Sequence, residues 1–321
     1  MKSSSELFPV SLIRAEIIAD TFIEDTYLVK PNNSPDKSVQ IAVTRLGYYN
    51  SAADQHRQPI ILIHGSFTNR SFWFSPKGKG LARALLEAGL DPWMLEHRGH
   101  GDSQENLDYK NNTVEAYAQF DLPAVSSFVK EQTKVNPIWI GHSMGGVSIA
   151  TSIALGEISN ANCKGVILLG AQTSKYPLLM RLPGIRLATR LLLLAKKPLI
   201  KSNKGPEHEP LGIAKEFTRW SGFFHGWKGR TGIKFWQNLK NTSVPVLAFG
   251  AKNDSGDPAK YCEKLATSID DNAQYHELSK NKGYSLDYGH VNMIISEQAK
   301  SEVWPQIINW INTTKSGQGN D

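Results

Sequence analysis

Residues 137–146 read PIWIGHSMGG, and this stretch is the strongest indication of the fold. The apolar residues at its start are typical of a buried strand, and residues 144–155 have a helical pattern. Between them lies a G-x-S-x-G motif centred on Ser143, which is typical of a tight strand-to-helix turn that exposes a serine. Since glycine has no Cβ, Gly141 and Gly145 allow strand and helix to approach closely. The stretch therefore predicts Ser143 as a nucleophile at the end of a strand.

The composition suits one large domain. The chain has 321 residues, of which 40% are hydrophobic, enough for a sizeable core. No long apolar run predicts a membrane span, and the first fourteen residues lack the apolar stretch of a signal peptide. The two cysteines, Cys163 and Cys262, have no metal-ligand spacing. We therefore expect a cytoplasmic protein with no metal and no cofactor; its oligomeric state is left open.

Short apolar strands alternate with helical stretches along most of the chain. Such alternation predicts a mostly parallel central sheet with helices on both faces. At the start, residues 16–29 and 38–48 alternate apolar and polar residues around a turn at 31–35, which predicts an antiparallel hairpin. The expected buried strands are 60–63, 91–95, 165–169, 244–249 and, more weakly, 274–278; the expected helices are 80–88, 113–135, 144–155 and 297–312.

About seventy residues separate two of these strands, 165–169 and 244–249. Such a length exceeds one crossover connection and predicts an inserted helical cap. We expect a core domain of residues 1–171 and 241–312, a cap of residues 172–240, and a flexible tail of residues 313–321.

Later loops supply partners for Ser143. In folds with this turn, the acid and then the histidine follow the serine, each on a loop after a later strand. Asp254 follows the strand at 244–249, with Asp257 as its rival, and His290 follows the last strand. His290 would take the proton of Ser143, and Asp254 would fix the tautomer of the imidazole ring.

The negative charge of a tetrahedral intermediate needs preorganised N–H donors. The amide of Met144, directly after the nucleophile, is one expected donor. The loop after His64 and Gly65 should provide the other, from Ser66 or, failing that, from Phe67.

These motifs together resemble the α/β-hydrolase superfamily, and within it the acid lipase group. The resemblance implies an α/β-hydrolase fold, ester hydrolysis and Asp254 as the acid. The chain departs from that group at Met144, where those lipases usually carry glutamine. The matching residues are His64-Gly65 with Trp73, Arg98-Gly99-His100-Gly101, Asp121-Leu122-Pro123-Ala124, Asn253-Asp254, Asp257-Pro258, Tyr288, His290, Asn292, Met293 and Ile294.

The net positive charge of the chain is concentrated in the cap. Residues 172–240 hold fourteen Lys and Arg against three Glu, a local charge of +11, while the rest of the chain carries −5. A basic amphipathic helix is expected from Pro183 through Leu194, which could contact an anionic membrane surface or simply pack on the core. No nucleic-acid signature accompanies this charge. The expected substrate-binding residues are Phe67, His142, Trp220 and Phe224.

The sequence therefore predicts a serine hydrolase that cleaves carboxylic esters with apolar acyl groups through an acyl-enzyme, like an esterase, lipase or lysophospholipase. Its substrate would be a small-molecule or lipid ester. The alternatives with the same three residues are thioesterase, amide hydrolase, peptidase and acyltransferase, because the fold alone does not separate them. A non-catalytic binding protein is disfavoured because serine, acid and histidine are all present.

Overall fold

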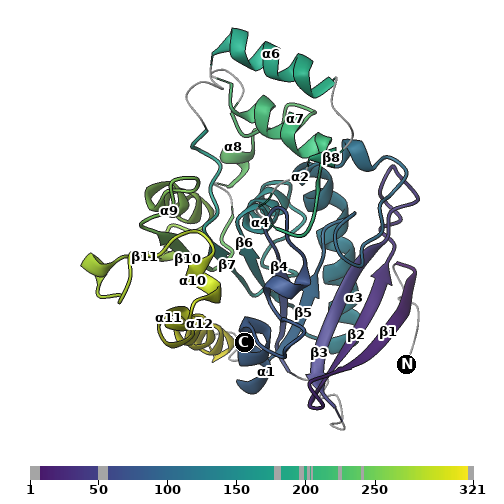
Figure 1. The fold of residues 1–321 in the computed structure, drawn as a ribbon, viewed down its shortest axis with the longest axis vertical. Coiled ribbons are helices and arrows are strands. Elements are labelled where there is room, and N and C mark those ends of the chain that lie inside the picture. The colour runs from purple at the N-terminus through teal and green to yellow at the C-terminus, as the bar shows by residue number, and fades with distance from the viewer. Residues whose placement is uncertain are drawn as a thin grey trace.

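A twisted sheet forms the centre of the molecule (Figure 1). The computed structural model describes residues 8–49, 57–176, 182–194, 199–200, 203, 205–222, 226–239 and 242–316. Among them, nine strands form one sheet in the order β1-β2-β3-β5-β4-β6-β7-β10-β11. The strands are β1 (Val10–Ile18), β2 (Phe22–Val29), β3 (Ile41–Tyr48), β4 (Pro59–Ile63), β5 (Asp91–Leu95), β6 (Ile138–His142), β7 (Gly165–Leu169), β10 (Val246–Ala251) and β11 (Gln274–Leu278).

The directions of the strands confirm a mostly parallel sheet. From β5 to β11 every neighbouring pair is parallel, whereas β1, β2 and β3 form antiparallel pairs and β3 is antiparallel to β5. In a parallel set the carboxyl ends of the strands lie at one edge, so the loops that follow β4, β6, β7 and β10 meet there.

Helices cover both faces of the sheet. Alternate residues of β4 show the division, because Ile61 and Ile63 pack with α3 and α4, while Ile60 and Leu62 pack with α1 and α12. Helix α9 joins the first group, and α10 and α11 join the second. The bounds are α1 (Leu81–Glu87), α2 (Val114–Ala116), η3 (Tyr117–Asp121), α3 (Leu122–Thr133), α4 (Met144–Ala154), α9 (Ala259–Ile269), α10 (Asn292–Ile295), α11 (Glu297–Glu302) and α12 (Trp304–Ser316).

The expected antiparallel hairpin is present, because β2 pairs with β3, but its first arm at 16–29 is wrong: it is two strands joined by a tight turn. Ala19 and Asp20 have positive φ angles of 49° and 54°, which reverse the chain between β1 and β2. Tight hairpin turns with positive φ usually carry glycine or asparagine, so this pair gave no turn signal in the sequence.

The helix expected at 297–312 is also two helices, since α11 ends at Glu302 and α12 begins at Trp304. Pro305 explains the break, because it has no N–H to donate to the carbonyl of Ser301. Helix α12 then continues to Ser316, so the first four residues of the expected flexible tail are helical. The helix expected at 113–135 contains a π-helical turn, η3, directly before Pro123.

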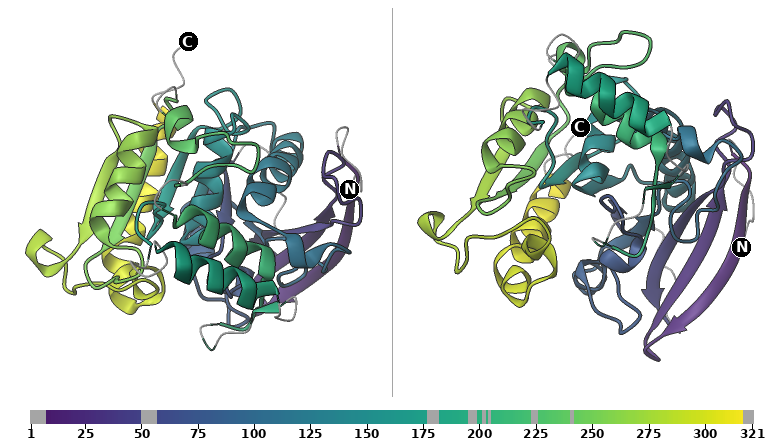
Figure 2. Two further views of the ribbon diagram at one scale, coloured as in Figure 1. Left: turned by 90° about the horizontal axis from the view of Figure 1, so that it is seen from above. Right: turned by 45° about the horizontal axis from the view of Figure 1, so that its top comes forward.

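The cap lies above the carboxyl edge of the sheet (Figures 1 and 2). It contains α6 (Pro183–Leu194), as expected, and β8 (Leu199–Ile200), β9 (Glu209–Pro210), α7 (Leu211–Trp220) and α8 (Phe235–Leu239). Trp220, Trp227 and Phe235 are buried in the same apolar cluster as α3 and α4, so this part of the cap shares the core of the sheet. No helix in the described part of the chain is long and apolar enough to cross a membrane.

A carboxylate of the cap also holds a helix of the core. The buried side chain of Glu216 on α7 accepts a hydrogen bond of 2.6 Å from the backbone N–H of Val114, at the start of α2. The first N–H groups of a helix have no partner inside it, so this contact satisfies one of them. Burial raises the pKa of Glu216 to about 8.

A buried ion pair connects the loop after β5 to η3. The guanidinium of Arg98 donates two hydrogen bonds to the carboxylate of Asp121, one of them 2.8 Å long, and both side chains are almost fully buried. Burial raises the pKa of Asp121, and the charge of Arg98 opposes that shift. Removing one partner leaves the other charge buried and unpaired, which is costly.

We therefore expect Asp121→Ala to lower the free energy of unfolding by about 3–5 kcal/mol. The control is Glu87→Ala, which breaks the exposed pair of Arg83 and Glu87 on α1 and should cost less than about 1 kcal/mol. Urea unfolding followed by circular dichroism measures both. Equal losses would contradict the assignment of the buried pair as a structural element.

Candidate active site

Ser143 lies in the turn between β6 and α4, at the carboxyl edge of the sheet. Its φ and ψ are 52° and −119°, a conformation that non-glycine residues rarely adopt. The N–H of Ser143 donates to the carbonyl of Leu169 at the end of β7, with a distance of 2.9 Å. The strained turn is therefore tied to the neighbouring strand, and the serine side chain remains partly exposed.

Three glycines make this turn possible. A Cβ at Gly141 would lie 2.6 Å from the backbone nitrogen of Gly146, and a Cβ at Gly145 would lie 2.5 Å from the carbonyl oxygen of Ile63. A Cβ at Gly146 would lie 2.5 Å from the Cβ of Ala171. Side chains at these positions would therefore push α4 away from β6, from the end of β4 and from the loop after β7.

His290 is hydrogen-bonded to Asp254. The distance from His290 Nδ1 to Asp254 Oδ2 is 2.5 Å, whereas the nearest oxygen of Asp257 is 3.6 Å away. The other oxygen of Asp254 accepts the backbone N–H groups of Gly256 and Asp257 at 3.0 and 2.9 Å. Burial alone would raise the pKa of Asp254, but these hydrogen bonds outweigh it and lower the pKa. By contrast, burial raises the pKa of Asp257.

His142 holds His290 next to the turn. Its ring lies 4.6 Å from the ring of His290, and its Nε2–H donates to the carbonyl of His290 at 3.0 Å. Phe72 stacks on His142 at 4.8 Å. Burial lowers the pKa of His142 to about 3, so the ring is neutral. Ser143 follows His142 directly; the side chain of His142 itself is buried beneath His290 and does not line an open wall.

The loop after β4 lies against the other side of the turn. A Cβ at Gly65 would be 3.1 Å from the Cβ of Ser143, and the hydroxyl of Ser66 donates to the sulfur of Met144 at 3.4 Å. Within the described residues, the backbone N–H groups of Ser66 and Met144 make no hydrogen bond. The N–H of Phe67 does make one, of 2.7 Å, to Glu209. Of the expected donors, only Ser66 and Met144 thus remain available.

His64 fixes the peptide plane that carries the Ser66 amide. Its Nε2 accepts the N–H of His97 at 3.2 Å, so Nδ1 carries the proton and donates to the carbonyl of Gly65 at 2.8 Å. The hydroxyl of Thr68 donates to the same carbonyl at 3.2 Å. In a trans peptide the C=O and N–H point in opposite directions, so these bonds also orient the N–H of Ser66. Sequence reasoning missed this role of His64.

The structure places the expected substrate-binding residues Trp220 and Phe67 in different elements, at the end of α7 and in the loop after β4. Trp220 is buried and donates to the carbonyl of Lys228 at 2.9 Å. It lines a cavity of about 280 Å³ with Tyr176 and Trp227, next to the loop after β7. Phe224 lies outside the described residues, and Phe67 is partly exposed in the loop after β4.

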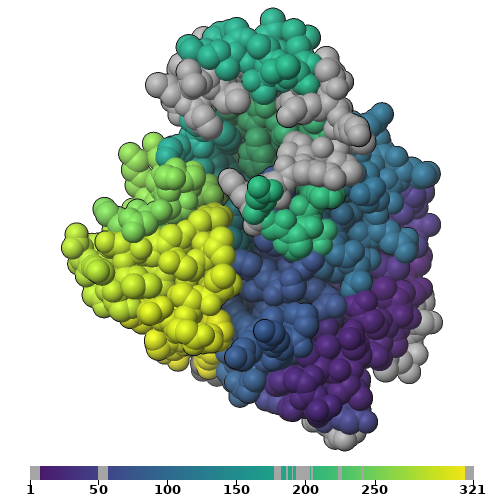
Figure 3. All heavy atoms as spheres, in the orientation of Figure 1, coloured from purple at the N-terminus to yellow at the C-terminus, as the bar shows by residue number. Residues whose placement is uncertain are grey.

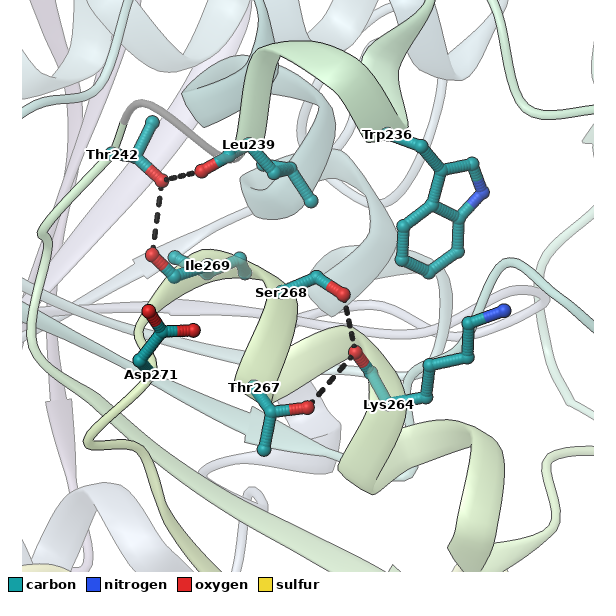
Figure 4. Close-up of a pocket in the computed structure, with 8 residues that line it drawn as sticks. All are labelled: Trp236, Leu239, Thr242, Lys264, Thr267, Ser268, Ile269 and Asp271. Carbon is teal, nitrogen blue, oxygen red and sulfur yellow. Dashed lines mark hydrogen bonds between the residues drawn. The ribbon is translucent and has the colours of Figure 1, made fainter.

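A larger hollow of about 560 Å³ lies between α8 and α9 (Figure 4). The hydroxyls of Thr242, Thr267 and Ser268 all donate to backbone carbonyls, so their protons are already engaged within the protein. Trp236 and Lys264 face each other across the hollow at 5.0 Å. The hollow is therefore a junction of cap and core, with no reactive group.

Asp254, Asp257 and His290 are also the one set of described residues whose ligand atoms lie close enough for a metal ion, within 4.8 Å of one another. Their atoms already serve protein partners, because Asp257 accepts the amide of Gln172 at 2.9 Å and Asp254 accepts three N–H groups. The closeness of these three residues is therefore explained by the hydrogen bond between His290 and Asp254, with the carboxylate of Asp257 beside that pair.

Comparisons with known proteins agree on the fold. A family model for the α/β hydrolase fold matches residues 58–192. An esterase from Thermogutta terrifontis superposes with a TM-score of 0.60 at 17% identity, over 89% of this chain and 98% of the esterase. The chain thus has the α/β-hydrolase fold.

Curated relatives add a resemblance to lipases. Human gastric triacylglycerol lipase is 30% identical over 131 residues, which are 38% of this chain and 30% of the lipase. A tear acid lipase-like protein of Mesocricetus auratus is 32% identical over 145 residues, which are 42% of this chain and 33% of the relative. The match therefore spans about a third of the length of these relatives, and the chain is similar to lipase- and esterase-type hydrolases in that part.

The hydrogen bonds of His64 predict its titration. Burial lowers the pKa of His64 from 6.5 to about 3, so the contribution of the neutral ring is complete above 6.5 and is lost as pH falls towards 3. Imidazole ¹⁵N NMR should show His64 as the neutral Nδ1–H form between about pH 5 and about pH 8, a range in which an ordinary histidine titrates. Titration of His64 near 6.5 would refute its buried, bonded state.

Proposed function

We propose that this α/β-hydrolase-fold protein is a serine hydrolase of carboxylic esters, with Ser143 as nucleophile, His290 as base and Asp254 as acid. The observation that carries the proposal is the hydrogen bond from His290 to Asp254 beside the strained turn of Ser143. The resemblance to lipases and esterases supports the choice of ester as the bond that is cleaved.

The reaction follows from the roles of these groups. Because Nδ1 of His290 faces Asp254, Nε2 is the nitrogen that takes the proton of Ser143 as the serine oxygen attacks the ester carbonyl. His290 then gives this proton to the leaving alcohol, and an acyl-enzyme on Ser143 remains. Water, activated by the same nitrogen, attacks the acyl carbon and releases the acid and free Ser143.

The N–H groups of Ser66 and Met144 are proposed to bind the oxyanion. They come from two segments that meet at Ser143, and no described residue accepts from them. Donors that point at a developing charge without a competing acceptor stabilise the transition state and need no reorganisation.

The acyl group is proposed to be apolar and to lie under the cap. The cavity lined by Trp220, Tyr176 and Trp227 adjoins the loop after β7, and Gly170 of that loop is close enough to His290 that a Cβ would lie 3.3 Å from Nδ1. The aromatic part of this lining, which stands beside the polar Thr173, Ser174, Ser221 and Lys264, is proposed to favour a hydrocarbon chain. The same three residues also serve the hydrolysis of thioesters and amides, so a direct assay distinguishes these substrates from esters.

An anionic lipid surface is the proposed partner of α6, which forms the top of the molecule in Figure 3. Leu187, Leu191 and Leu192 have exposed fractions of 59%, 57% and 65%. A cluster of exposed leucines is unusual on a soluble surface and is typical of an interaction site. The +11 charge of residues 172–240 favours a negatively charged partner.

Ser143→Ala should abolish both ester hydrolysis and labelling by a fluorophosphonate probe, because the probe reacts only with an activated serine. A panel of p-nitrophenyl esters, thioesters and anilides over a range of acyl lengths then defines the bond and the chain. Wild-type protein that is neither labelled nor active on any ester would contradict the proposal. If thioesters are cleaved faster than esters, the proposed substrate becomes a thioester.

Asp254→Asn should lower kcat by about 10⁴-fold, since an amide at this position favours the wrong tautomer of the histidine ring. Asp257→Asn is the matched control and should lower kcat by less than about tenfold, because Asp257 is 3.6 Å from His290 Nδ1. A larger loss from Asp257→Asn than from Asp254→Asn would reverse the assignment of the acid.

Leu191→Asp with Leu192→Asp should weaken binding to vesicles of phosphatidylglycerol and phosphatidylcholine by at least about tenfold, because burying two leucines is worth several kcal/mol. Leu107→Asp is the control, since Leu107 is 94% exposed in a loop outside the cap. Co-sedimentation measures the binding. Equal loss in the control, or no binding by the wild type, would remove the lipid surface as a partner.

A further inference from the structure

A short segment of the cap, residues 205–210, lies against the loop that carries the Ser66 amide. A Cβ at Gly205 would be 2.0 Å from the carbonyl oxygen of Phe67, so this approach requires glycine. The backbone N–H of Glu207 donates to that same carbonyl at 3.1 Å. The side chain of Asn69 donates to the carboxylate of Glu207 at 2.5 Å. The cap therefore contacts the loop through both backbone and side chains.

Glu209 makes the most buried of these contacts. Its Oε1 accepts the backbone N–H of Phe67 at 2.7 Å and lies 3.2 Å from Nε2 of His100. Glu209 is 2% exposed and His100 is fully buried. A hydrogen bond to a carboxylate is about twice as strong as one between neutral groups, and burial removes the competition of water. This bond is thus a strong constraint on Phe67.

His100 in turn holds the carboxylate of Glu209. Burial lowers the pKa of His100, but the charge of Glu209, the hydrogen bond to it and the charge of Glu207 together outweigh burial, so the pKa is raised overall. A raised pKa of His100 means that His100 and Glu209 attract each other in the folded protein. The loop after β5 therefore supports the same oxygen of Glu209 that accepts the Phe67 N–H.

The backbone at Phe67 needs such support. Its φ is 63°, in the left-handed region that costs a non-glycine residue free energy. Ser66 stands between two peptide planes. The plane before it is held by His64 and Thr68 through the carbonyl of Gly65. The plane after it is held by Glu209 through the N–H of Phe67.

We infer that Glu209 is a positioning residue, through which the cap fixes the direction of the Ser66 N–H in the oxyanion site. The inference rests on the proposed function, because it gives the Ser66 amide a task only if Ser143 is acylated. Glu209 contacts neither substrate nor Ser143; it acts through the backbone of Phe67. The oxyanion site is therefore complete only while residues 205–210 are docked on the loop.

The test compares Glu209→Ala, Glu209→Gln and Glu216→Ala in the full chain, on a p-nitrophenyl ester that the wild type hydrolyses. Glu216 is the matched control, because it is also a buried cap carboxylate that accepts a core N–H, but at α2 and not at the loop. Loss of one oxyanion donor costs about 10²–10³-fold in kcat, so a misdirected donor should cost about 10–100-fold. We expect that loss for Glu209→Ala, with KM changed by less than about threefold and fluorophosphonate labelling slowed by a similar factor.

Glutamine keeps one oxygen that can accept the Phe67 N–H but loses the charge, so Glu209→Gln should recover most of kcat. Glu216→Ala should lower the unfolding midpoint and leave kcat within about twofold of the wild type. The amide proton of Phe67, shifted downfield by its carboxylate partner, should move upfield in Glu209→Ala. This NMR signal reports the contact independently of activity.

Three outcomes would overturn the inference: wild-type kcat in Glu209→Ala, equal loss of kcat in Glu209→Ala and Glu216→Ala, or a rise in KM with no fall in kcat. If Glu209→Ala does not fold, Glu209→Gln decides: an upfield move of the Phe67 amide signal should come with a fall in kcat, and such a move with wild-type kcat would overturn the inference. A wild type without labelling or hydrolysis would instead remove the proposed function, which separates the two failures.

Discussion

The close approach of β6, α4 and the end of β4 is the constraint on which the rest of the structure depends. At Gly145 a methyl group would lie 2.5 Å from the carbonyl oxygen of Ile63, and at Gly141 it would lie 2.6 Å from a backbone nitrogen. Backbone atoms do not give way as a flexible side chain does, so only glycine is tolerated. This contact sets the conformation of Ser143, places the loop after β4 beside it, and lets α4 begin directly after it.

Two neutral, buried histidines lie beside this turn. His64 and His142 have their pKa values lowered to about 3 by burial, so each ring keeps one donor and one acceptor with a fixed direction. Each ring uses its donor on a backbone carbonyl, of Gly65 and of His290 respectively. Asp254, by contrast, stays ionised because three N–H groups point at it. The same region thus contains two neutral histidines that orient backbone carbonyls and one histidine, His290, that is paired with a charged carboxylate.

The cap is joined to the core by carboxylates as well as by apolar contacts. Glu216 reaches the first turn of α2, and Glu209 reaches the loop that holds Ser66. These two acids come from a segment that is otherwise strongly basic, and both are buried where they accept backbone N–H groups of the core. Trp220 and Trp227 bury the joint, which makes the cap part of the main core and not a separate layer. A cap connected in this way can affect the chemistry of the site without contacting Ser143.

By itself, the sequence was enough to predict the parallel sheet, the turn at Ser143, the loops that carry Asp254 and His290, and the bounds of α6. These are local properties, because the periods of strands and helices, the spacing of glycines and the order of motifs can be recognised from residues close together in the sequence. Even some local features escaped it, such as the turn at Ala19 and Asp20, since alanine rarely adopts a positive φ angle.

The tertiary structure alone decided how distant groups pair. It selected the hydrogen bond of His290 to Asp254 over Asp257, placed His142 beneath His290 and engaged the Phe67 amide with Glu209. No residue near Phe67 in the sequence indicates that its amide contacts Glu209, which lies 142 residues away in the chain. Such contacts depend on the relative placement of whole strands and of the cap, which results from packing summed over the entire core.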